Sequence, residues 1–249
     1  MTNIDIIPPQ NLMDEVGRGD PAKFREIGET YLQFFQDLCE IKPTDKILDV
    51  GCGVGRIAIP LTNYLQNGGT YDGFDISPDG IKWCQDYITP QYPNFKFQVS
   101  DIYNSRYNPT GKVTASAYNF PYDDGTFDLI CLTSVFTHLI AADLENYLSE
   151  IARVLKSGGR CLITIFLLNS ESLKLIDSNL SRFNFQHELD RVSRVINPHI
   201  PEEAIAYQED FILDLYAKYG LQIMPPIRYG KWCGRTEFFS GQDIIIAGK

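Results

Sequence analysis

Three glycines alternate with other residues directly after a short apolar segment, in "KILDVGCGVGR", residues 46–56. Asp49 precedes the glycines, and a second acid, Asp75, ends the next apolar segment, residues 71–75. A glycine-rich turn between a buried strand and a helix exposes bare backbone to a ligand at the helix N-terminus. An acid at the end of the second strand can accept hydrogen bonds from both hydroxyls of a ribose. The two segments together predict a nucleotide-binding site.

The spacing of the glycines differs from that of a dinucleotide site. The dinucleotide fingerprint is G-x-G-x-x-G, in which the third glycine stands three places after the second. Here Gly55 follows Gly53 by two places, and Arg56 occupies the position of the dinucleotide glycine. The spacing therefore disfavours a pyrophosphate-containing ligand.

The run Asp49-Val50-Gly51-Cys52-Gly53-Val54-Gly55 resembles the first motif, (D/E)-x-G-x-G-x-G, of the class I S-adenosylmethionine-dependent methyltransferases. The segments "YNFPYDDGTFDLICLTSVFTHL" (118–139) and "YLSEIARVLKSGGRCLIT" (147–164) resemble the fourth-strand and fifth-strand segments of that family, in the same order. The resemblance covers residues 46–168. It implies methyl transfer, with S-adenosyl-L-methionine as cofactor and S-adenosyl-L-homocysteine as product.

The resemblance also implies which residues bind the cofactor. Asp49 is expected to face its ammonium and sulfonium groups, Asp75 its ribose, and Ile76 its adenine. Many relatives place an acid followed by alanine before the equivalent of "NFPY"; this chain has Ser116-Ala117 there, and Asp101-Ile102 is the alternative. The expected cofactor site consists of Asp49, Gly51, Cys52, Gly53, Arg56, Asp75, Ile76, Ser116, Ala117 and Thr133.

Methyl transfer is an in-line displacement, so alignment of the reactants and exclusion of water are the main catalytic requirements. The methyl group is expected near the carboxyl end of the fourth strand, which places residues 133–138 at the reaction space. His138 is the candidate general base for a hydroxyl acceptor, because histidine has an ordinary pKa of about 6.5. The alternative is a histidine that packs beneath the cofactor loop. Arg56 either holds a carboxylate of the cofactor or acceptor, or is a surface charge at a helix start.

The acceptor is expected to be a small molecule, methylated more readily at oxygen than at nitrogen. The family's exocyclic-amine and amide enzymes usually carry Asn/Asp-Pro-Pro-Tyr after the fourth strand, whereas residues 132–135 here are "LTSV". Trp232 and Arg235 lie in "RYGKWCGR", which is either part of the acceptor site or an ordinary hairpin tip. Two other functions stay open: a non-catalytic S-adenosylmethionine-binding regulatory module, and a nicotinamide oxidoreductase.

Composition narrows the choice of partners and location. A net charge of −10 would repel a phosphate backbone, so nucleic acid is not an expected partner. The longest apolar run, around residues 161–168, is too short to span a membrane. Six cysteines without C-x-x-C spacing, and acids and prolines in residues 1–17, favour a reduced, cytoplasmic protein. Three dispersed histidines do not support a metal site. Oligomeric state is not indicated.

Strand-like and helical segments alternate along residues 46–168, which predicts an α/β fold. We expect a Rossmann-like, doubly wound, seven-stranded, mostly parallel sheet with an antiparallel last strand. Residues 1–249 are expected to form a single methyltransferase domain. Its parts are an N-terminal helical cap (1–45), the cofactor-binding core (46–168), an insertion (169–206), and a closing helix with strands (207–249).

Helical spacing locates the first and last helices of the chain. Asp20 and Pro21 are typical of a helix start, and the apolar positions that follow are Phe24, Ile27, Tyr31, Phe34, Leu38 and Ile41. The closing helix is expected to end at Gly220 and to carry Ala204, Tyr207, Phe211, Leu215 and Tyr219 on one face.

Overall fold

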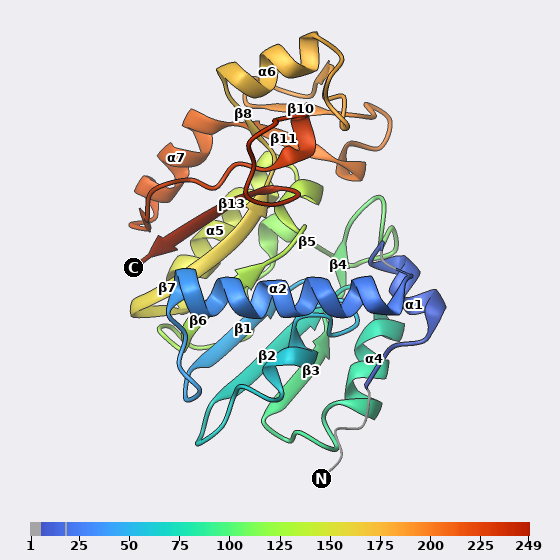
Figure 1. Ribbon diagram of the computed structural model, residues 1–249, viewed down its shortest axis with the longest axis vertical. Helices are drawn as coiled ribbons and strands as arrows, with labels where there is room; N and C mark the ends of the chain where they lie inside the picture. The colour runs from blue at the N-terminus through green and yellow to red at the C-terminus, as the bar shows by residue number, and fades with distance from the viewer. Residues whose placement is uncertain (1–5, 18) are drawn as a thin grey trace. The chain divides into compact units, whose positions relative to one another are not determined.

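The computed structural model describes residues 6–17 and 19–249, and its chain divides into two compact units (Figure 1). The first unit extends to Ser100 and includes Phe127–Cys131; the second comprises Asp101–Thr126 and Leu132–Lys249.

A seven-stranded sheet has the order β12-β13-β7-β6-β1-β2-β3. Strands β1, β2 and β3 are parallel to one another, whereas β13 runs antiparallel to β7. The predicted α/β class and the mostly parallel sheet with an antiparallel last strand are therefore confirmed. The strands span Lys46–Val50 (β1), Thr70–Asp75 (β2), Phe95–Val99 (β3), Phe127–Leu132 (β6), Leu155–Ile165 (β7), Gln222–Ile223 (β12) and Asp243–Gly248 (β13).

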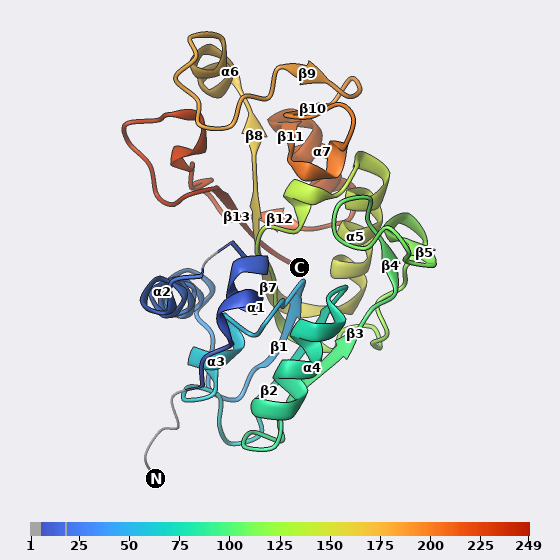
Figure 2. The same cartoon turned by 90° about the vertical axis from the view of Figure 1, so that its right-hand side faces the viewer.

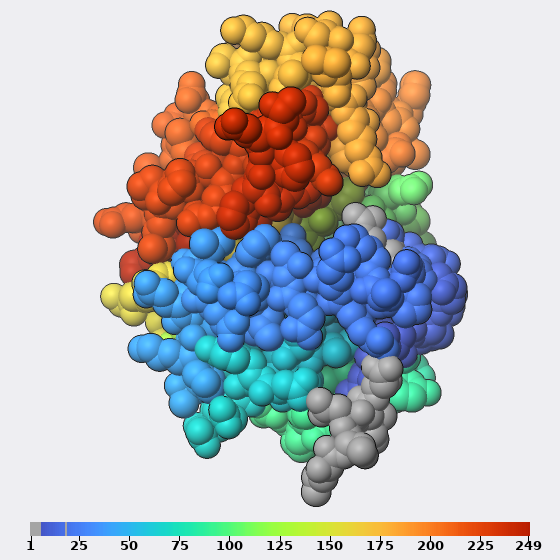
Figure 3. All heavy atoms as spheres, in the orientation of Figure 1, coloured from blue at the N-terminus to red at the C-terminus, as the bar shows by residue number. Residues whose placement is uncertain are grey.

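The helices of the first unit are α1 (Gln10–Glu15), α2 (Pro21–Cys39), α3 (Ala58–Leu61) and α4 (Pro78–Tyr87). Helix α2 runs across β1, and its outer surface is uncovered in the space-filling view (Figures 1 and 3). The Asp20 side chain caps α2 by accepting hydrogen bonds from two backbone N–H groups, as the sequence predicts. The buried residues of α2 are Phe24, Gly28, Phe35 and Cys39. Of the predicted stripe, Phe24 and Ile41 are buried and the other four residues are half-buried, so the buried face of α2 is rotated from that stripe.

The second unit contains α5 (Ala141–Val154), α6 (Ser170–Asp177), α7 (Glu209–Lys218) and a short two-stranded pair, β4 (Ile102–Tyr103) with β5 (Val113–Thr114). It also has a four-stranded sheet, β8-β11-β10-β9, whose strands β8, β10 and β11 are seen as neighbours in Figure 2. These strands span Leu167–Leu168 (β8), His187–Glu188 (β9), Ser193–Val195 (β10) and Ile205–Gln208 (β11). Four 3₁₀ turns lie at Ala115–Ala117 (η1), Phe136–His138 (η2), Pro201–Glu203 (η3) and Lys231–Cys233 (η4).

The prediction that the closing helix includes Ala204 and Tyr207 is wrong. Residues Ile205–Gln208 form β11, and α7 begins only at Glu209. The backbone N–H of Tyr207 donates to Phe166 O, and β11 pairs with both β8 and β10. A short run of buried residues fits a helix or a central strand equally well, so the neighbouring strands decide its structure.

Trp232 lies inside the second unit rather than at a hairpin tip. Its side chain is buried, and its ring centroid lies 5.1 Å from that of Phe166 and 5.4 Å from that of Phe185. These rings belong to an apolar cluster that also includes Leu168 and Ile176. The loop before β13 is thereby anchored to β8 and α6.

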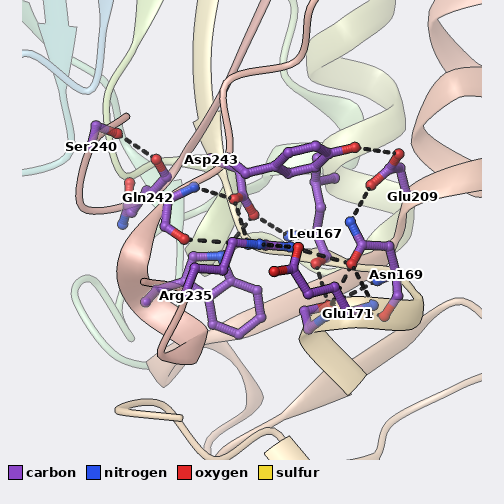
Figure 4. Close-up of polar contacts among 12 residues, drawn as sticks. Leu167, Asn169, Glu171, Glu209, Arg235, Ser240, Gln242 and Asp243 are labelled. Atoms are coloured by element: carbon purple, nitrogen blue, oxygen red, sulfur yellow. Dashed lines mark hydrogen bonds and ion pairs between the residues drawn. The ribbon is translucent and has the colours of Figure 1, made fainter. Parts of the chain in front are cut away.

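A buried carboxylate fixes the same loop by hydrogen bonds (Figure 4). Asp243 accepts from the backbone N–H groups of Gly230 and Leu167, at 2.6 and 2.8 Å, and from Trp232 Nε1 at 2.7 Å. Arg235 Nη1 donates to Asp243 Oδ1, the oxygen that also accepts from Gly230, at 3.3 Å. Burial raises the pKa of Asp243 to about 6, although these donors and the guanidinium favour its charged form.

Arg235 continues the network away from Asp243. Its Nε donates to Glu171 at 2.9 Å and its Nη2 to Asn169 Oδ1 at 3.2 Å, while the guanidinium lies 4.7 Å from the ring centroid of Tyr229. The Arg235 side chain is only 2% exposed. Arg235 therefore connects the segment after η4 to the start of α6.

Arg235→Met is expected to lower the free energy of unfolding by about 3–5 kcal/mol, because Asp243 would lose its buried counter-charge. The measurement is urea-induced unfolding followed by circular dichroism. Lys82→Ala is the control: its ion pair with Asp86 is exposed and screened by solvent, so its loss should leave the stability nearly unchanged. Equal stability losses in the two variants would contradict the role given to Arg235.

Candidate nucleoside-binding site

The turn between β1 and α3 is bent by its glycines. Gly51, Gly53 and Gly55 have φ values of 78°, 54° and 75°, in the left-handed region that favours glycine. The N–H groups of Gly51 and Cys52 both donate to Phe74 O, at 2.8 and 3.1 Å. The sequence-predicted glycine loop is therefore folded back onto the end of β2.

Asp75 is held directly against this loop. Its Oδ2 accepts from Gly53 N at 2.7 Å and its Oδ1 from Ser77 N at 2.9 Å. Burial raises the pKa of Asp75, and the backbone N–H donors partly offset that effect. Each carboxylate oxygen can accept a further hydrogen bond. The structure thus brings together Asp75, Gly53 and, next along the chain, the half-buried Ile76.

Asp49 is almost completely enclosed, with 1% of its surface exposed. Tyr71 donates its hydroxyl hydrogen bond to Asp49 Oδ2 at 2.6 Å, whereas the buried Oδ1 has no hydrogen-bond partner. Burial raises the pKa of Asp49 to about 6; hydrogen bonds from Tyr71 and Cys131 oppose the rise, and the charge of Asp75 adds to it. The side chain is therefore a buried carboxylate with one unmatched oxygen.

Two residues that sequence reasoning missed lie against the loop from the N-terminal side. Arg56 Nη1 donates to Val16 O at 3.3 Å, and Ser77 Oγ lies 3.5 Å from Glu15 Oε2. A Cβ atom on Gly53 would approach Val16 Cγ1 to 2.9 Å. No motif marks Glu15 or Val16, because the contact joins segments far apart in the sequence. The predicted role of Arg56 toward a carboxylate stays a prediction.

Gly73, in the middle of β2, is another residue that no motif marks. A Cβ atom there would lie 2.9 Å from Cys52 Sγ. Cys52 is buried, so the loop can sit on β2 only where the strand has no side chain. A glycine inside a strand is a recognised sign of close backbone approach, and that signal could have found it.

The remaining predicted cofactor residues belong to the second unit. Ser116 and Ala117 lie exposed in η1, where Ser116 N donates to Asp143 Oδ1 at 2.7 Å. The alternative residue, Asp101, is exposed and lies 3.3 Å from Lys112 Nζ. Thr133 follows β6 directly and is buried. Whether these residues contact a cofactor stays a prediction.

His138 ends η2 and has a defined hydrogen bond. Its Nδ1 lies 2.9 Å from Glu202 O. A carbonyl oxygen only accepts, so Nδ1 carries the proton and Nε2 is the proton acceptor of the neutral ring. Burial lowers the pKa of His138, which keeps the ring neutral at physiological pH. The Tyr107 ring packs edge-on at a centroid distance of 5.1 Å.

The family model described as "Methyltransferase domain" matches residues 48–163, just under half of the chain. This match supports the predicted resemblance of residues 48–163 to the class I S-adenosylmethionine-dependent methyltransferases. It begins within β1 and ends within β7, so the matched region includes the glycine loop, Asp49 and Asp75.

Proteins similar to this part of the chain occur in bacteria and plants. Methyltransferase GfsG of Streptomyces halstedii is 30% identical over 139 residues, 55% of this chain and 44% of that protein. Ajmaline N-methyltransferase of Rauvolfia serpentina is 32% identical over 135 residues, 52% of this chain and 38% of that protein. The matched region spans less than half the length of these curated relatives.

A solved S-adenosylmethionine-dependent methyltransferase from Methanosarcina mazei shares the fold. Its TM-score is 0.57 at 22% sequence identity, and the match covers 84% of this chain and 94% of that one. At this identity the likeness shows the fold alone.

The acceptor atoms beside the glycine loop fit a cationic nucleoside. Asp49 Oδ1 is a buried acceptor without a partner, and Asp75 retains acceptor capacity beside bare backbone. An ammonium or sulfonium group would balance the charge of Asp49, and ribose hydroxyls would donate to Asp75.

Within the described residues, no group of three or more His, Cys, Asp and Glu is placed to hold a metal ion. None of the described helices has the length and apolar character needed to cross a bilayer.

The raised pKa of Asp49 predicts a stability difference that depends on pH. A carboxyl with a pKa of about 6 when folded and 3.8 otherwise binds its proton more tightly in the folded protein. Folding is therefore favoured as the pH falls through 6, and this gain is absent above it. The quantity to compare is the unfolding free energy of the unliganded wild type minus that of Asp49→Asn. This difference should be about 2 kcal/mol larger at pH 4.5 than at pH 7.5.

Urea unfolding at both pH values gives this difference directly. Asp123→Asn, at an exposed position, is the matched control and should follow the wild type at both pH values. A difference between wild type and Asp49→Asn that stays constant with pH would show that Asp49 does not titrate in this range.

Proposed function

We propose that this protein transfers a methyl group from S-adenosyl-L-methionine to a small-molecule acceptor, with oxygen as the preferred acceptor atom. The observation that carries the proposal is the buried carboxylate of Asp49 together with the half-buried carboxylate of Asp75, beside a glycine loop inside the matched region. Opposite charge and ribose hydroxyls are the ligand features that this pair can recognise.

Each part of the first unit would have a separate task toward the cofactor. Asp75 would accept hydrogen bonds from the ribose, while Gly51 and Gly53 let the backbone lie along the ligand. Asp49 would balance a cationic group, and Ile76 would pack on the adenine. The role of Ser116-Ala117, or of the alternative Asp101, toward the adenine stays a prediction from the sequence. When bound, the cofactor supplies the methyl group on a positively charged sulfur.

A hydroxyl acceptor needs a group that removes its proton, and His138 has the required chemistry. The hydrogen bond to Glu202 O fixes the tautomer in which Nε2 accepts a proton, and burial favours the neutral ring. Residues 132–135, "LTSV", contain no asparagine or aspartate for an exocyclic amine. The named activity of the ajmaline relative is N-methylation, so the preference for oxygen rests on His138 and residues 132–135. The charge of −10 supports a small acceptor over nucleic acid.

The binding part of the proposal is tested by calorimetry with S-adenosylmethionine and with NADH. We expect S-adenosylmethionine to bind and NADH not to bind, since the spacing of the glycine loop does not suit a pyrophosphate. A screen of hydroxylated metabolites with methyl-labelled cofactor then tests the chemistry. Tight binding of NADH would favour the oxidoreductase alternative, whereas cofactor binding without methyl incorporation into any acceptor would favour a regulatory module.

Asp75→Ala is expected to weaken S-adenosylmethionine binding by about 1–3 kcal/mol, because a charged acceptor of ribose hydrogen bonds is removed. Isothermal titration calorimetry measures the change. Asp72→Ala is the control on the same strand, since Asp72 lies an odd number of residues from Asp75 and faces the other side of the sheet. Wild-type affinity in Asp75→Ala would remove this residue from the site.

His138→Asn is expected to slow turnover by roughly 10²–10⁴-fold while leaving cofactor affinity unchanged. Asparagine can still donate to Glu202 O but has no equivalent of Nε2, so the local structure is kept and the base is lost. The assay is methyl incorporation between pH 6 and 9 with an acceptor found in the screen. His187→Asn, at an exposed position of β9, should behave as wild type. Turnover as fast as wild type across this range would show that no base acts from position 138.

A further inference from the structure

The side chain of Tyr71 is held in place by burial and by packing against two other aromatic rings. Its side chain is fully buried in β2, and its ring stacks on Phe95 of β3 at a centroid distance of 5.2 Å and an interplanar angle of 16°. The ring of Phe97 lies 5.4 Å away on the same strand. The hydroxyl that donates to Asp49 Oδ2 at 2.6 Å is therefore carried by a ring with little freedom to move.

Several groups act on Asp49 from the elements around it. Asp75, on β2, disfavours its charge; Arg56, after the glycine loop, favours it; and Cys131, on β6, favours it by hydrogen bonding. Tyr71 provides the larger of the two hydrogen-bonding effects, and it engages only one of the two oxygens. Oδ1 stays buried without a hydrogen-bond partner.

We propose that Tyr71 is a positioning residue for the cationic part of the cofactor: its hydroxyl engages Asp49 Oδ2, reserves Oδ1 for the ligand, and keeps the carboxyl ionised at neutral pH. This inference rests on the proposed function, because it assigns a ligand to Oδ1. Tyr71 itself touches no reacting atom. Its effect reaches the ligand through the charge and orientation of Asp49.

The proposal has a consequence for binding as a function of pH. A cation binds the ionised carboxyl, so the apparent affinity falls as the pH drops through the pKa of Asp49, about 6 in the unliganded protein. Removing the Tyr71 hydroxyl takes away a hydrogen bond that favours the ionised form. The fall in affinity should then occur at a higher pH.

The test compares wild type with Tyr71→Phe by calorimetric titration of S-adenosylmethionine from pH 5.5 to 9. Phenylalanine keeps the ring and its stacking on Phe95. We expect binding roughly three- to fivefold weaker than wild type between pH 6 and 6.5, and within about twofold of it at pH 8.5. Tyr216→Phe is the matched control: Tyr216 is equally buried, its hydroxyl has no hydrogen-bond partner, and its pH profile should superimpose on that of wild type.

A uniform loss of affinity at every pH would indicate a structural role only and would overturn the proposal. Superimposable profiles of Tyr71→Phe and wild type would do the same. Asp49→Asn is the second variant: it should bind weakly with no acid-side decline, and a persisting decline would show that another group is responsible.

Carboxyl carbon NMR of the unliganded protein gives a readout independent of the cofactor. The resonance missing in Asp49→Asn identifies Asp49, and its titration midpoint should move to higher pH in Tyr71→Phe. An unchanged midpoint would overturn the inference even where wild type binds S-adenosylmethionine. A wild type that titrates as expected but binds no S-adenosylmethionine at any pH would instead overturn the proposed function.

Discussion

The backbone N–H of Gly53 donates to Asp75 across the ends of two parallel strands, and the candidate site depends on this bond. It requires a turn that returns sharply to the sheet, which positive φ values at Gly51, Gly53 and Gly55 make possible. Asp49, two residues before Gly51, is almost completely removed from water. The bend of the backbone thus brings the N–H of Gly53 to Asp75, beside a buried carboxyl group.

The buried aspartates of the two units differ in their hydrogen-bond partners. Asp243 accepts from two backbone N–H groups and an indole and faces Arg235, so its hydrogen-bonding capacity is used within the protein. Asp49 is equally buried, yet one of its oxygens lacks a partner. A satisfied network stabilises a loop, whereas an unmatched carboxylate costs stability that a ligand can recover. The contrast separates a structural charge from one suited to binding.

The second unit adds a small sheet that the alternating pattern does not contain. Strand β11 pairs with β8 and β10, and Trp232 and Arg235 attach the loop before β13 to this addition. All four strands of this small sheet lie beyond the matched residues 48–163. The matched residues therefore contain the proposed cofactor site in the first unit, and the small sheet lies outside them.

The sequence by itself determined the strand, glycine loop and helix, the parallel sheet and the capped helix α2, because local spacing and periodicity encode them. It also predicted Asp49 and Asp75 as candidate cofactor-binding residues. Only the tertiary structure decided that residues 205–208 form a strand, that Val16 lies against Gly53, and that Tyr71 engages Asp49. Those contacts join segments distant in the chain, and their energies depend on burial and on partners that no local pattern specifies.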